Sequence, residues 1–107
     1  MDREIFAVEV LQCVERGLDA HGPSIKHNVY WKLLTEFNMR PTDIVDNPKM
    51  FVQVLDTMFG AGAVLIERTI AKELISRFEI SMSTSRISKA LRVAKESYSL
   101  EAPMITS

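Results

Sequence analysis

The side chains best suited to metal binding or nucleophilic chemistry are one cysteine and two histidines: Cys13, His21 and His27. A structural zinc site usually takes about four such ligands, arranged in close pairs. These three form no close pair, so we expect no metal site. Cys13 also falls on an apolar helical face, where a thiol behaves as a small hydrophobic side chain rather than as a reactive nucleophile.

The other feature that suggests chemistry is Gly60-Ala61-Gly62, because helix N-termini bind anions. A phosphate-binding loop would follow a strand and precede Lys-Ser/Thr, and neither condition is met. Gly60 instead suits the end of a helix, where glycine adopts the left-handed conformation. The carboxylates fall on solvent-facing positions or in the Asp43/Asp46 loop, without the apolar pairing that tunes an acid or base. We therefore expect a non-enzymatic protein without a cofactor.

Helical periodicity accounts for most of the chain. Apolar residues recur three and four positions apart over residues 2–18, 24–37, 48–59, 61–78 and 85–98. The sequence predicts an all-α fold, a compact bundle of about five helices with short connections. The fourth segment has the widest apolar face, so we expect it to be central. A single turn is predicted at 42–45, and a loose tail after Pro103.

Two segments resemble each other: residues 33–39 and 74–80. Each ends a helical pattern with an aromatic residue and places an apolar residue two positions later. An ancient duplication or shared helix-end chemistry would explain this similarity.

Charge divides the chain of 107 residues unevenly. Residues 1–80 carry nine Lys/Arg against twelve Asp/Glu, whereas residues 81–107 carry four against two. We expect residues 1–80 to form the helical core domain. Residues 81–107 are expected to form a basic amphipathic helix and tail, packed on the core or on a partner. The charged N-terminus lacks the apolar core of a signal peptide, and no apolar run approaches the roughly 20 residues that span a bilayer. A cytoplasmic protein with no membrane association is expected.

Three apolar side chains fall outside the main apolar faces of the first two helices: Trp31, Ile5 and Val8. An exposed Trp is typical of the centre of a protein interface. Another part of the chain that covers Trp31 would explain it equally well. The two helices together indicate an interaction surface for self-association or for a protein partner.

The last helix carries four cations on one broad arc: Arg86, Lys89, Arg92 and Lys95. This arc suits nucleic acid, or it is a solvated face opposite a stripe that packs on the body. The pI of about 6.1 and the lack of interleaved aromatic residues argue against nucleic acid.

Several motifs together resemble a small archaeal all-helical family of the Nitrosopumilus output domain type. The motifs are Gly22-Pro23-Ser24-Ile25-Lys26, Asn47-Pro48-Lys49-Met50-Phe51, Phe59-Gly60-Ala61-Gly62-Ala63 and Arg77-Phe78. The resemblance covers about residues 5–80. It implies an all-helical module, free-standing or attached to signalling proteins as an output element, and it implies no catalytic residues.

The function we expect is a non-enzymatic interaction or regulatory module that self-associates as a homodimer. The alternative is a nucleic-acid-associated regulator that uses the basic C-terminal helix. A third class, a sensor of a small ligand, needs a polar-lined cavity that no sequence pattern reveals.

Overall fold

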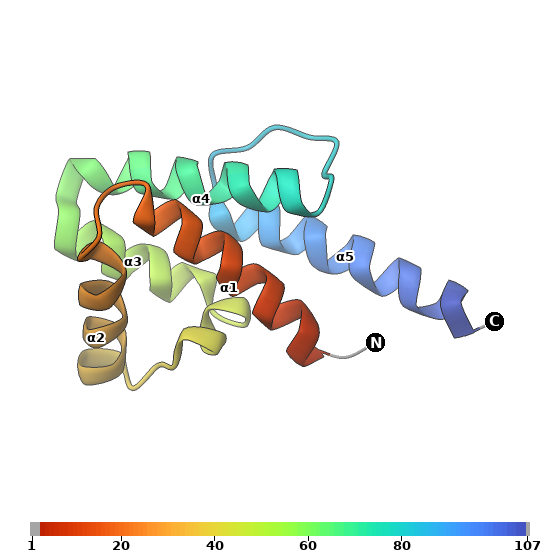
Figure 1. The fold of residues 1–107 in the computed structure, drawn as a ribbon, viewed down its shortest axis with the longest axis horizontal. Coiled ribbons are helices and arrows are strands. Elements are labelled where there is room, and N and C mark those ends of the chain that lie inside the picture. The colour runs from red at the N-terminus through yellow and green to blue at the C-terminus, as the bar shows by residue number, and fades with distance from the viewer. Residues whose placement is uncertain (1–2, 107) are drawn as a thin grey trace.

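The computed structural model describes the backbone of residues 3–106 and the side chains of residues 4–97. Within that part of the chain the fold is all-α, which confirms the prediction from periodicity (Figure 1). The elements in order are α1 (Arg3–Asp19), α2 (Ile25–Phe37), the 3-10 turn η1 (Pro41–Val45), α3 (Pro48–Phe59), the 3-10 turn η2 (Gly60–Gly62), α4 (Ala63–Arg77) and α5 (Ile87–Thr106).

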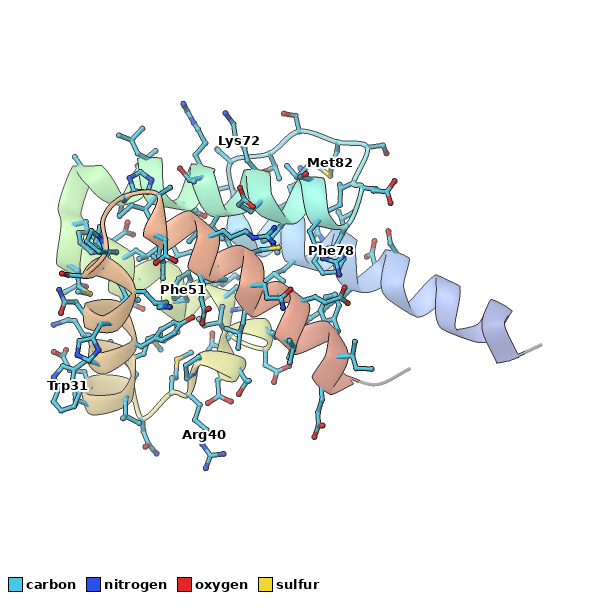
Figure 2. All side chains as sticks on the ribbon, in the orientation of Figure 1. Trp31, Arg40, Phe51, Lys72, Phe78 and Met82 are labelled. Carbon is cyan, nitrogen blue, oxygen red and sulfur yellow. The ribbon has the colours of Figure 1, made fainter. Side chains whose placement is uncertain are left out.

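The central helix is α4, as its wide apolar face predicts, and it packs against α1, α3 and α5. Its closest neighbour is α1, which crosses it where Gly17 faces Ile70. Figure 2 shows Phe51 of α3 inside the bundle, where it is fully buried. The core also takes Ile44 and Val45 from η1, so the predicted single turn is present and contributes apolar side chains.

Helix α3 begins and ends with the predicted residues. Asn47 is its N-cap, and the side-chain oxygen accepts a hydrogen bond from the N–H of Met50 at 3.4 Å. Pro48 is the first helical residue, where its missing N–H costs nothing. Gly60 ends the helix with φ of 54°, a conformation that favours glycine. The chain turns there through η2 into α4, which runs back over the body (Figure 1).

One stretch of the described residues, Pro48–Arg77, has the length and the apolar composition of a membrane span. In the structure it is not a single straight helix, because it contains α3, the corner at Gly60 and α4. The two helices pack against each other. Core burial in a helical bundle gives the same apolar composition, so this stretch is weak support for membrane insertion.

Helix α5 joins the same core through one stripe of buried residues: Ile87, Ala90, Leu91 and Ala94. It then continues beyond the body (Figure 1). The prediction of a loose tail after Pro103 is wrong as far as Thr106, because α5 includes those residues. A proline in the last turn removes one helical hydrogen bond and does not stop the helix at that point.

Candidate functional site

The residues considered for metal binding or catalysis do not come together. Cys13 is buried, and its thiol donates a long hydrogen bond to the carbonyl of Glu73 at 3.6 Å. Burial, assisted by the Glu73 charge, raises the pKa of the Cys13 thiol to about 11, so it stays protonated at neutral pH. His21 pairs with Thr69 at 3.0 Å. The side chains that the structure describes contain no group of three or more His, Cys, Asp or Glu able to hold a metal ion.

Trp31 lies on the outer side of α2, at the end of the molecule (Figure 2). Its side chain is 62% exposed, so no other part of the described chain covers it. Leu34, one turn further along, is 51% exposed, although helical periodicity predicts it on the buried face. The reason is that α2 buries only a narrow face, which contains Val29 and Leu33.

Beside Trp31 lies a shallow apolar groove of about 350 Å³, which we call the Trp31 groove. Its lining residues are His27, Tyr30, Trp31, Leu34, Met39, Arg40 and Pro41. The Tyr30 hydroxyl donates a hydrogen bond to Glu15 of α1 at 3.2 Å, which holds this wall in place. Burial and the Glu15 charge raise the pKa of Tyr30, so the hydroxyl remains a donor. The groove is therefore an apolar concave surface next to an exposed aromatic ring.

Ile5 and Val8 are also exposed, at 47% and 52%, but the structure does not bring them to Trp31. They lie in the first turns of α1, whereas α2 meets α1 further along, at Glu15. At 1.5 Å per residue, that is roughly 10–15 Å along the helix axis. The three predicted interaction residues thus belong to two separate surfaces.

The four cations predicted for nucleic-acid contact, Arg86, Lys89, Arg92 and Lys95, are all exposed on α5. None of them forms an ion pair with another residue that the structure describes. The stripe on the opposite side of α5 packs on the core, so the four cations form the solvated face of a packed helix, and contact with nucleic acid stays a prediction.

The structure adds a second group of cations that sequence reasoning missed. Arg68 and Lys72 of α4 line an open groove of about 680 Å³, which we call the basic groove. The complete lining is Arg68, Lys72, Ile75, Ser76, Ser83, Thr84 and Ser85. One signal was available in the sequence, because Arg68, Lys72 and Ser76 are four residues apart and form one polar row on the helix. The loop that faces this row could not be placed from the sequence.

Glu67 is the exception to the expectation that carboxylates lie on solvent-facing positions. It is only 8% exposed, and its carboxylate accepts a hydrogen bond from the N–H of Ile87 at 3.0 Å. An acidic group at a helix N-terminus satisfies a free N–H and interacts favourably with the helix dipole. In the hydroxyl-rich segment before α5, the Thr84 hydroxyl accepts a hydrogen bond from the N–H of Arg86 at 3.1 Å.

Comparison with family models found no match, and comparison with curated proteins and with solved structures found no significant similarity.

Proposed function

We propose that this protein is a non-enzymatic interaction module that self-associates through the Trp31 groove. The observation that supports this proposal most directly is the 62% exposure of Trp31 beside an apolar groove. A Trp side chain that stays in water forgoes the burial of a large apolar surface. Trp is also the residue type most enriched among the anchors of protein interfaces. A regulatory role as a signalling output element rests on the sequence resemblance alone.

A second copy of the chain is the occupant that suits this surface best. In a two-fold dimer the same patch meets itself, so it must contain both a projecting side chain and a matching hollow. Trp31 projects next to a hollow whose walls include Met39 and Pro41. On the same helix, Lys32 and Glu36 neutralise each other through an ion pair at 2.6 Å. Two copies of α2 therefore approach each other without a strong charge penalty from this pair.

Size-exclusion chromatography with light scattering over a concentration series tests the proposal. Trp31→Ala is expected to shift the dimer toward the monomer, since truncating an aromatic anchor costs about 2 kcal/mol, roughly thirtyfold in affinity. Helical circular dichroism should be unchanged, because the side chain contributes little to the core of one copy.

Val8→Ala is the matched control, because it removes an apolar side chain of 52% exposure from α1. Dimerisation should be unaffected by this change. If Val8→Ala weakens the dimer as much as Trp31→Ala does, the interface includes α1 and the assignment to α2 is wrong. A wild-type chain that stays monomeric at high micromolar concentration contradicts self-association.

A second candidate function is nucleic-acid binding through α5, which is supported by the exposure of its four cations without an acidic partner among the described residues. A gel-shift titration at low salt tests it. Binding should weaken steeply with salt, as expected for about three or four phosphate contacts. Arg92→Ala and Lys95→Ala should then reduce the affinity for every sequence about equally.

A further inference from the structure

The basic groove is formed by a loop that returns along α4. After α4 ends, the loop of residues 79–86 runs back beside the helix before α5 begins (Figure 1). Figure 2 shows Lys72 projecting from the side of α4 over which the loop arches, while Met82 of the loop turns toward the body. Met82 packs against the core and so anchors the loop. This course places Ser83–Ser85 opposite the polar row of α4.

The lining of the groove is positive and rich in hydrogen-bond donors. It contains two cations, Arg68 and Lys72, and no carboxylate. Neither cation forms an ion pair within the described part of the chain. Two carboxylates are adjacent to these cations in sequence, and neither lines the groove. Glu67 is turned inward and accepts a hydrogen bond from the N–H of Ile87, and Glu73 lies 4.0 Å from Arg16 of α1. Four hydroxyl residues complete the lining: Ser76, Ser83, Thr84 and Ser85.

We propose that the basic groove binds the phosphate group of a small phosphorylated ligand. A guanidinium, an ammonium and several hydroxyl groups together supply the donors that a phosphate dianion accepts. Two cations match a single phosphate rather than the repeated phosphates of a nucleic acid. The groove volume of about 680 Å³ exceeds what one phosphate occupies and lies in the range typical of small-molecule sites. This site shares no residue with the Trp31 groove, so phosphate binding and self-association are tested by different variants.

Titration of the full chain with inorganic phosphate and with glycerol phosphate, followed by amide NMR, tests the proposal. Both should bind in the millimolar range or tighter, with shifts centred on residues 68–76 and 83–86. Arg68→Ala/Lys72→Ala should weaken binding at least about tenfold, since each change removes a charge-assisted hydrogen bond. Ser83→Ala/Ser85→Ala, which keeps the charge, should weaken it several-fold.

The matched control is Lys89→Ala/Arg92→Ala, which removes the same charge from exposed positions on α5. It should leave phosphate affinity unchanged, and circular dichroism checks that every variant is folded. Equal weakening by both double variants would mean that phosphate responds only to net charge, and the proposal would be wrong. It is also overturned if neither phosphate saturates a shift, or if a short single-stranded oligonucleotide binds these residues more tightly than glycerol phosphate does.

Discussion

Gly17 lets α1 approach α4 more closely than any larger residue would allow. A Cβ atom at this position would overlap Cγ1 of Ile70 and would lie 3.0 Å from its Cα. A change of side-chain rotamer relieves the first contact but not the second, because the Cα belongs to the backbone. Glycine in a helix interior costs about 1 kcal/mol relative to alanine, and here close packing of the two helices offsets that cost.

Gly17→Ala is therefore expected to destabilise the protein although it raises helix propensity. Overpacking of a core costs about 1–3 kcal/mol and the gain in helix propensity is about 1 kcal/mol, so the net loss should be at most about 2 kcal/mol. Urea unfolding followed by circular dichroism measures it. A variant as stable as the wild type would show that α1 and α4 move apart without penalty.

Gly60 is needed for a different reason, its backbone conformation. No atom lies within 4 Å of the position that a Cβ would take, yet φ is 54°. Gly60→Ala should cost about 1–3 kcal/mol through backbone strain alone. Gly62 has φ of −68° and room for a Cβ, which makes Gly62→Ala the matched control. We expect that control to be neutral or slightly stabilising in the same urea experiment, and equal losses in the two variants would contradict this explanation.

At the scale of elements, local signals predict where helices end. They bear on the similarity between residues 33–39 and 74–80, because both segments lie at a helix end. A residue with positive φ follows each of α2 and α4: Asn38, the C-cap of α2, at 52°, and Glu79, one residue after the C-cap of α4, at 51°. The next N–H then bonds back to the last turn, from Met39 to Leu33 and from Ile80 to Ile75, each at 3.0 Å. Both apolar residues are buried. The two segments therefore share helix-end chemistry, which is one of the two explanations of their resemblance.

The cap of α5 shows the limit of local reasoning. Its acceptor, Glu67, lies 20 residues away on α4 and comes close only through the course of the loop. A sequence signal existed, since Glu67 shares a helical face with Ala63, Ile70 and Ala71. That pattern indicates a buried carboxylate but does not identify what the carboxylate binds, which depends on tertiary packing.

Glu67→Ala should lower the free energy of unfolding by about 1–3 kcal/mol, because it leaves the N–H of Ile87 buried without a partner. Glu67→Gln keeps an oxygen acceptor in place and should cost less. Hydrogen exchange at the amide of Ile87 provides a local readout, and exchange should be fastest in the alanine variant. Unchanged protection in Glu67→Ala would show that this bond does not hold the start of α5.

At the scale of the whole molecule, the sequence predicted the fold class and the central helix, but the candidate sites only in part. Periodicity places a side chain on one face of its own helix, so the outward position of Trp31 was predictable. It does not place helices relative to one another. Ile5 and Val8 therefore proved to be on a surface separate from Trp31. That Arg68 and the loop residues Ser83–Ser85 line the same groove was not predictable either.

Truncation of the chain after residue 80 tests how much α5 contributes to the stability of the fold. Residues 1–80 contain α1 to α4, and their apolar faces predict that they fold alone. Removing residues 81–107, however, uncovers the surface that buries Ile87 and Leu91, which are 0% and 1% exposed. Burying side chains of this size contributes about 1.5–3 kcal/mol each, a large share of the roughly 5–15 kcal/mol that stabilises a domain.

We therefore expect the chain of residues 1–80 to remain helical and to unfold cooperatively, but at a clearly lower urea concentration than the full chain. Leu91→Asp in the full chain should lower the midpoint in a similar way, because a buried charge detaches α5. Arg92→Ala changes an exposed neighbour and should leave the midpoint where it is. A gradual, non-cooperative loss of helix in the shortened chain would instead make α5 an obligatory part of a single folding unit.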